Sequence, residues 1–295
     1  MLYNLSKEEV KRLRNSHVLP DFPNAEMLIA SIQTETDTVK AILPNPLAPS
    51  DTPKAIVFVA HYPETNFGCV YREGALLLQC TFRNEIGFYC LSMPVDDDMA
   101  MIGGRESFGF PKKIAEKITL EKKGNHITGS VERKGTEIIR IEGVFNEQSE
   151  ANLDKEFGAS MTDWNGEVCK RVVNFLFKYF PSPGGSSFDY LPRLIREPVL
   201  FRKTGKIMVG EGEVKLSSTP YDPLGEIPVK VVDSLFYGKW HNTMLPGKAV
   251  ARAWNPLKFV KHSFFKTDFA PTFLANYDED RIKKAKEILH AAKKF

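Results

Sequence analysis

The strongest constraint on the fold is a series of short apolar, β-branched segments separated by tight-turn residues. Ile118–Leu120, Ile127–Val131 and Glu137–Val144 are separated only by Gly124-Asn125 and Lys134-Gly135. Glycine and asparagine tolerate the positive φ angles of tight hairpin turns, so this spacing predicts an antiparallel meander. Similar runs predict further strands at Glu26–Ile32, Ala55–Ala60, Ala75–Phe82, Ile86–Met93, Val172–Phe180, Val199–Lys203, Lys206–Val209, Glu213–Ser217 and Lys230–Tyr237.

Helices are expected only around this β framework. Ser6–Arg14 predicts a short helix, because Ser6 and Glu9 form a capping box, and Thr36–Leu43 predicts another. Residues 149–168 are polar and unpatterned, which indicates an insertion or loop with room for a helical turn. Residues 278–295 predict a C-terminal helix whose apolar stripe should pack on the β domain or on a partner: Ile282, Ala285, Leu289 and Ala292. The prediction is a single α+β, mainly antiparallel domain over residues 1–295.

Composition excludes several classes of protein. The net charge is only +3 over 295 residues, with acidic and basic residues interspersed, which argues against a nucleic-acid or membrane-surface protein. No apolar run is long enough to span a membrane, and the N-terminus has no signal-peptide core. The four cysteines, Cys69, Cys80, Cys90 and Cys169, show no CxxC spacing, so we expect buried thiols and a cytoplasmic location.

Familiar catalytic motifs are missing from the sequence. The six histidines form no HExxH pair, and Asp96-Asp97-Asp98 is more typical of a solvated loop than of a cation site. Pro183-Gly184-Gly185-Ser186-Ser187 lacks the lysine of a phosphate-binding loop, and there is no GxSxG nucleophile motif. We therefore expect no metal and no cofactor, and lysine chemistry remains.

The stretch Gly103–Ile114 is the candidate for that chemistry. Three glycines and Pro111 favour an irregular backbone, and Phe108 and Phe110 precede the pair Lys112-Lys113. Burial disfavours the charged form of lysine, and a neutral amine is a nucleophile. The alternative is a surface turn with solvated lysines.

Gly104-Arg105-Glu106 followed by Phe110-Pro111-Lys112-Lys113 resembles the GRE…(Y/F)PKK signature of the acetoacetate decarboxylase family. Upstream, Tyr71-Arg72-Glu73 resembles the family's Tyr-x-Glu segment. The resemblance implies a cone-like antiparallel β-barrel, a Schiff base on Lys112, a second lysine at Lys113 and a glutamate, Glu73, that lines the site. It also implies a small keto acid or other carbonyl substrate and assembly into homo-oligomers.

The two lysines are not expected to act together. If Pro111–Ile114 is extended, Lys112 and Lys113 point to opposite faces, and Lys113 is at most a weak electrostatic perturber. Desolvation by Phe108, Phe110 and barrel residues is then the larger influence on Lys112.

The sequence departs from the family where the substrate carboxylate is bound. The family's arginine falls at Ala25, a second acidic position falls within Ala55–Val59, and the tyrosine before the proline is Phe110, which we expect to contact the substrate. Arg72 neighbours Glu73, but alternation points it away. Decarboxylation of a β-keto acid is the first hypothesis. The alternatives are an aldolase-dehydratase acting on a larger or more apolar carbonyl compound, and a ligand-binding barrel without catalysis.

Overall fold

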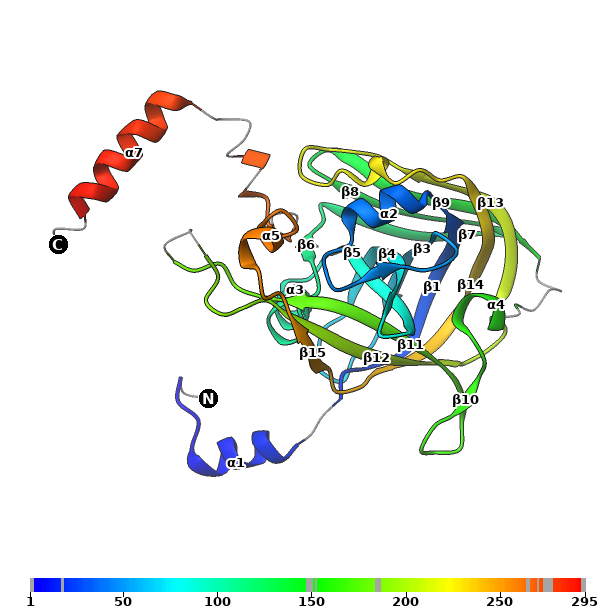
Figure 1. Ribbon diagram of the computed structural model, residues 1–295. Coiled ribbons are helices and arrows are strands. Elements are labelled where there is room, and N and C mark those ends of the chain that lie inside the picture. Colours follow the sequence, from blue (N-terminus) through cyan, green and yellow to red (C-terminus); the bar gives the residue numbers. More distant parts are fainter. Residues whose placement is uncertain are drawn as a thin grey trace.

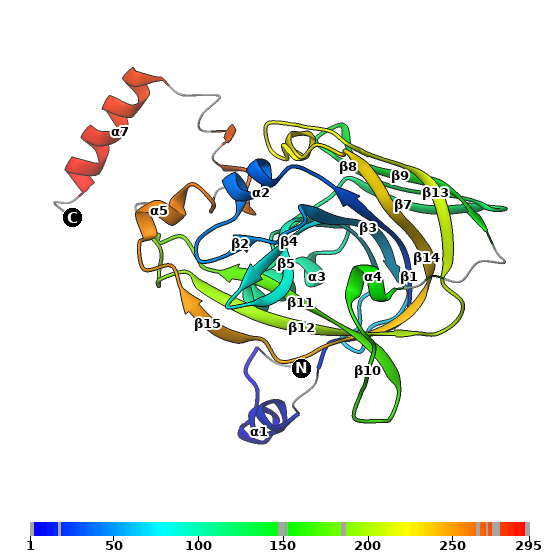
Figure 2. The ribbon, with the colours of Figure 1, turned by 45° about the vertical axis from the view of Figure 1, so that its right-hand side comes forward.

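The structure is a computed structural model that describes residues 3–16, 19–146, 151, 153–183, 187–263, 266–269, 271–272 and 278–292. Its centre is a closed barrel of seven strands (Figures 1 and 2). In order around the ring these are β14 (Val231–Met244), β1 (Asp21–Gln33), β3 (Lys54–Tyr62), β4 (Tyr71–Phe82), β5 (Glu85–Val95), β11 (Val168–Lys178) and β12 (Arg193–Lys203), which pairs again with β14. Within this ring only β5 and β11 run parallel. The predicted mainly antiparallel barrel is confirmed.

Beyond β14 the same sheet continues and folds over the outside of the barrel as an outer layer. From β14 it continues through β13 (Met208–Leu216), β9 (Thr136–Asn146), β8 (His126–Arg133) and β7 (Lys117–Lys123). Successive side chains of a barrel strand point to opposite faces, so each strand contributes to two hydrophobic cores: one inside the barrel and one between the barrel and the outer strands. In β1, Met27 and Ile29 face the barrel interior, while Leu28 and Ala30 pack under the outer layer formed by β13, β9, β8 and β7. The predicted meander is β7–β8–β9, with its turns at the expected residues.

Four short strands pair with strands of this sheet. They are β2 (Ala48–Pro49) beside β4, β6 (Lys112–Ile114) beside β5, β10 (Met161–Thr162) beside β11 and β15 (Lys248–Arg252) beside β12. The pairing of β6 with β5 is parallel, and it brings the signature lysines to the barrel wall.

The helices are short and peripheral (Figure 1). They are α1 (Lys7–Asn15), α2 (Thr36–Ile42), α3 (Asp98–Gly103), α4 (Asp154–Phe157), α5 (Pro256–Val260) and α7 (Glu279–Ala292), with a π-helix at Gly104–Phe108 and a 3₁₀ turn at Leu224–Glu226. The capping box of α1 is present: the Ser6 side chain accepts from the Glu9 N–H, and Glu9 accepts from the Ser6 N–H. In the described part of the chain, no helix is long and apolar enough to cross a membrane.

One strand prediction was wrong in detail, and one of the two alternatives given for the C-terminal helix does not hold. The strands expected at Lys206–Val209 and Glu213–Ser217 are one strand, β13, because its glycines allow close approach: a Cβ at Gly212 would lie 2.0 Å from the Glu142 carbonyl oxygen. The stripe of α7 does not pack on the barrel, since Ala285 is exposed and Ile282 is only half-buried, and the helix stands clear of the barrel in Figures 1 and 2. Packing of this stripe on a partner, the other alternative, stays a prediction. The side chains of Leu289 and Ala292 lie outside the described residues.

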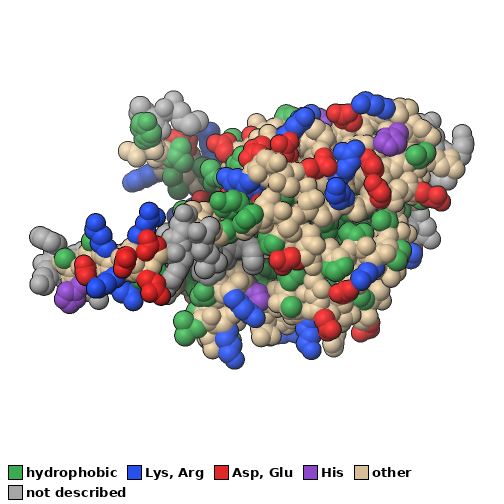
Figure 3. All heavy atoms as spheres, turned by 90° about the horizontal axis from the view of Figure 1, so that it is seen from above, with side chains coloured by type: hydrophobic (Ala, Val, Ile, Leu, Met, Phe, Trp, Pro, Cys, Tyr) green, Lys and Arg blue, Asp and Glu red, His purple; other side chains and the backbone are tan. Residues whose placement is uncertain are grey.

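The surface agrees with the small net charge. Lysine and arginine side chains are interspersed with aspartate and glutamate over the face seen in Figure 3. All four cysteines are buried free thiols. Burial raises the pKa of Cys80 to about 12, so that thiol is an inert part of the core.

Candidate active site

Lys112 and Glu73 meet inside the barrel. Lys112 begins β6, opposite Met93 of β5, and Glu73 lies on β4 opposite Val95. Lys112 Nζ is 2.7 Å from Glu73 Oε2, and the two side chains are only 8% and 5% exposed. The structure therefore brings together the two residues that the sequence singled out for covalent chemistry and proton transfer.

The irregular segment before Lys112 determines the position of its side chain. Asp97 caps α3 by accepting from the Ala100 N–H at 2.8 Å, and α3 leads directly into the π-helix. Gly109 ends this turn with φ 97°, and a Cβ there would lie 2.8 Å from the Phe177 carbonyl oxygen. Glycine meets both requirements, and the chain then turns Phe110 into the barrel.

The first two residues of the signature act directly on Lys112. Gly104 lies against its side chain: a Cβ at this position would come within 2.8 Å of Lys112 Cδ and Cε. Arg105 Nη1 donates to the Lys112 carbonyl at 2.9 Å and to the Lys266 carbonyl at 2.7 Å. The side chain of Glu106, the third signature residue, is exposed. The signature is thus mainly a device for placing Lys112.

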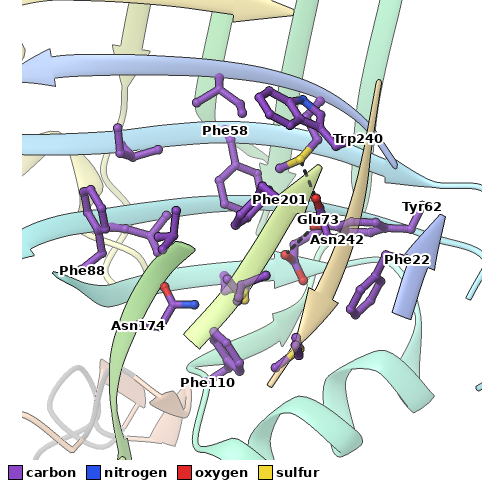
Figure 4. Close-up of a pocket in the computed structure, with 18 of the residues that line it drawn as sticks. Phe22, Phe58, Tyr62, Glu73, Phe88, Phe110, Asn174, Phe201, Trp240 and Asn242 are labelled. Atoms are coloured by element: carbon purple, nitrogen blue, oxygen red, sulfur yellow. Dashed lines mark hydrogen bonds between the residues drawn. The ribbon is translucent and has the colours of Figure 1, made fainter. Parts of the chain in front are cut away.

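The cavity around Lys112 and Glu73 is mostly apolar (Figure 4). Its volume is about 920 Å³, including the space at its mouth. No arginine is among the described residues that line it, and Ala25 is a fully buried part of the barrel core. Aromatic side chains dominate the wall: Phe22, Phe58, Tyr62, Tyr71, Phe88, Phe110, Phe157, Phe201 and Trp240.

Aromatic rings also surround the lysine itself. Lys112 Nζ lies 5.1 Å from the centre of the Tyr71 ring and 5.9 Å from that of Phe110. The Tyr62 hydroxyl donates to Glu73 Oε1 at 3.4 Å. Burial, together with the nearby Glu73, raises the pKa of both Tyr62 and Tyr71 well above its usual value. Both hydroxyls stay protonated near neutral pH. Phe108 packs on Phe110 and does not line the cavity.

Lys113 points to the other side of the barrel wall. Its Nζ donates to the Tyr221 carbonyl at 2.7 Å and to Asp222 Oδ1 at 3.0 Å, and lies 3.1 Å from Asp268 Oδ1. Arg133 binds the same two carboxylates. Burial alone would raise the pKa of Asp268, but Lys113 and Arg133 hold it below its usual range. This ion cluster joins β6, β8 and the two segments that carry the aspartates.

Arg72 is also outside the cavity. Its side chain is 43% exposed, and Nη1 lies 3.8 Å from Asp96 Oδ2. The alternation that places Glu73 inside the barrel places Arg72 outside it. The other cation of the lining, Lys170, is engaged by Asp154 and by the Gly158 carbonyl.

Several polar lining residues were not found from the sequence. Asn174, Trp240 and Asn242 line the cavity, and Glu197 is buried behind Asn174. Trp240 Nε1, Asn242 Oδ1 and Glu197 Oε1 have no hydrogen-bond partner among the described residues. In the sequence, each of these residues could be noticed only as a polar residue within a largely apolar strand. Only the closed ring of strands shows that they gather around one cavity.

Comparisons with known proteins identify the family. The family model for acetoacetate decarboxylase matches residues 9–253. The chain belongs to the acetoacetate decarboxylase family. Acetoacetate decarboxylase of Chromobacterium violaceum is 31% identical over 212 residues, which are 70% of this chain and 78% of that protein. A protein named "CLA biosynthesis isomerase" from Lactiplantibacillus plantarum is 23% identical over 222 residues, 74% of this chain and 78% of the other.

Solved structures show the same fold in an acetoacetate decarboxylase and in a biosynthetic enzyme. A crystal structure of acetoacetate decarboxylase from Legionella pneumophila has a TM-score of 0.69 at 21% identity, covering 81% of this chain and 89% of that one. The enduracididine biosynthesis enzyme MppR, complexed with the condensation product of pyruvate and imidazole 4-carboxaldehyde, has a TM-score of 0.57 at 18% identity, covering 78% and 88%.

Proposed function

We propose that this member of the acetoacetate decarboxylase family is a Schiff-base lyase that decarboxylates a β-keto acid carrying an apolar chain. The observation that carries the proposal is the 2.7 Å contact between Lys112 Nζ and Glu73 Oε2 within an apolar cavity. An amine and a carboxyl group in contact, shielded from water, are the groups that imine formation requires.

The contact supplies the nucleophile. Transfer of the Lys112 proton to Glu73 leaves an uncharged amine, which is the nucleophile, beside a carboxylic acid that can return the proton later. The amine adds to the substrate ketone to give a carbinolamine. Glu73 then protonates the departing hydroxyl group, so that water leaves and the iminium forms.

The iminium accepts the electrons of the breaking bond. The bond between the α-carbon and the carboxylate breaks, CO₂ leaves, and the electron pair becomes the C=C bond of an enamine. A proton from water is added to the α-carbon, and water hydrolyses the regenerated iminium to release the ketone and the free amine. The net reaction converts the keto acid and one proton to a ketone and CO₂. An apolar wall favours this step because negative charge spreads out as CO₂ forms.

The missing arginine supports a second candidate. With no arginine on the described wall, the cavity also suits a carbonyl compound whose reacting carbon bears no carboxylate. Once the iminium has formed on Lys112, the Glu73 carboxylate removes a proton from the α-carbon of the substrate, and the electron pair of that C–H bond becomes the C=C bond of an enamine. With a β,γ-unsaturated ketone, return of the proton to the γ-carbon moves the double bond. Otherwise the enamine carbon adds to an aldehyde and forms a new C–C bond. The relative named "CLA biosynthesis isomerase" favours the first outcome, and the aldolase-dehydratase hypothesis corresponds to the second.

Product analysis distinguishes the candidates. The purified protein is incubated in D₂O with 3-oxo acids of increasing chain length, with simple ketones, and with ketone–aldehyde pairs. Lys112→Ala is the control. Release of CO₂ that depends on Lys112 supports decarboxylation. Deuterium exchange or a condensation product without CO₂ release supports the second candidate. Binding of these compounds without any Lys112-dependent product would leave a ligand-binding barrel and overturn both.

A further inference from the structure

Glu197 is a buried carboxyl group without a counter-charge. It is fully buried on β12 and lies directly opposite Asn174 of β11, so both side chains are on the interior face of the barrel. Asn174 Nδ2 donates to Glu197 Oε2 at 2.9 Å, and Oε1 has no partner among the described residues. Nothing in the Lys112–Glu73 chemistry uses this pair.

The nearby cations are engaged elsewhere. Arg196 precedes Glu197 on the opposite face and binds Glu85 through two contacts, of 2.6 and 2.5 Å. Lys170 is engaged by Asp154. A buried carboxyl group with no cation is held in its neutral form. Burial raises the pKa of Glu197 to about 8, although the Asn174 hydrogen bond and Arg196 oppose the shift.

Asn174 is hydrogen-bonded to Glu197 and also lines the cavity. Its amide has two N–H donors and an oxygen acceptor, and Glu197 engages one of the donors. The other N–H and the oxygen remain for a ligand on a residue that lines the cavity. In Figure 4, Asn174 lies on the side of Phe88 and Phe110, and Tyr62 lies on the opposite side beyond Glu73.

We propose that Asn174, held in place by Glu197, is a second polar subsite that binds an uncharged hydroxyl group on the otherwise apolar chain of the substrate. A hydroxyl group both donates and accepts, as the free part of the Asn174 amide does. A second carboxylate on the chain would find no cation there. This proposal rests on the proposed function, because the chain must belong to a carbonyl compound bound at Lys112.

The test compares two series of 3-oxo acids of increasing chain length, one ending in a methyl group and one ending in a hydroxyl group. The measured quantities are kcat/KM and the yield of borohydride-trapped protein. We expect wild type to prefer the hydroxylated member about tenfold at one chain length, the value of one hydrogen bond. Asn174→Leu should reduce this ratio to about one, and Glu197→Gln, which keeps a neutral acceptor, should preserve it.

Val199→Ala is the matched control. Val199 lines the cavity on the same strand and face as Glu197, so this change adds space without changing polarity. It should alter the preferred chain length and keep the preference for hydroxyl. No hydroxyl preference at any length, or a preference that survives Asn174→Leu, overturns the subsite while trapping at Lys112 continues. Absence of trapping with both series would instead overturn the proposed function.

Discussion

Gly104 and Lys112 are in direct contact, and the missing side chain of the glycine is the space that the lysine occupies. A Cβ on Gly104 would come within 2.8 Å of Lys112 Cδ and Cε and within 3.4 Å of Nζ. Gly104 has φ −66° and ψ −43°, which any residue adopts. Its requirement for glycine therefore comes from Lys112 and not from the backbone.

Gly104→Ala should separate activity from stability. The added methyl group displaces the flexible end of Lys112 from Glu73, so we expect kcat to fall at least about tenfold, because general acid–base catalysis depends on this contact. The melting temperature should change little, since alanine suits a helical backbone. Gly103→Ala is the matched control, because a Cβ there has nothing within 4 Å. Equal kcat values for the two variants would contradict this role for Gly104.

Glu73→Gln should keep the shape of the site and remove its proton acceptor. We expect kcat to fall about 10²- to 10⁴-fold, the usual contribution of a positioned acid–base group, as measured by product formation. Arg72→Gln is the control, because Arg72 is adjacent in sequence but pairs with Asp96 outside the cavity. If Arg72→Gln impaired kcat/KM as strongly as Glu73→Gln, Arg72 would bind the substrate after all.

The signature lysines should differ in what their loss affects. Lys112→Ala should abolish activity. Lys113→Ala should retain much of it but lower the free energy of unfolding by about 1–3 kcal/mol, because Asp222 loses a buried partner. Urea unfolding and kcat measure the two effects, with exposed Lys117→Ala as the reference. Equal losses of activity from Lys112→Ala and Lys113→Ala would contradict the placement of Lys113 outside the chemistry.

Glu197 predicts a pH dependence of stability with a definite sign. Its pKa is about 8 in the folded protein, raised by burial from a usual 4.5, so between these values the folded state binds the additional proton. Raising the pH through this window should therefore lower the free energy of unfolding, by up to about 1.4 kcal/mol per pH unit from this group. Glu197→Gln should remove that contribution. If the difference in the free energy of unfolding between wild type and Glu197→Gln were constant from pH 5 to pH 8, the raised pKa of Glu197 would be refuted.

Local sequence signals predicted much of the fold and one part of the site. Turn residues and alternation located the strands, and the two-residue period correctly separated Lys112 from Lys113 and Glu73 from Arg72. Gly210 and Gly212 concealed the continuity of β13, because their role is close approach to β9 and not a turn. Asn174 and Glu197 could not be recognised, since their contact depends on the register of β11 against β12.

The sequence also did not explain why glycine and arginine precede the lysine in the signature. Gly104 and Arg105 are close to Lys112 along the chain, yet their contacts with its side chain and carbonyl require the π-helical turn. Such a turn has no simple periodic signal. The absence of the family's arginine at Ala25 was visible from alignment, and the structure shows that no other arginine among the described residues replaces it on the cavity wall.

Borohydride trapping followed by peptide mapping shows directly whether Lys112 forms a Schiff base. The protein is incubated with 3-oxo acids of several chain lengths, reduced, digested and analysed by mass spectrometry. We expect a reduced adduct on Lys112, absent in Lys112→Ala and retained at this site in Lys113→Ala. Failure of every carbonyl compound to label Lys112, or labelling of Lys113 in its place, would contradict this expectation.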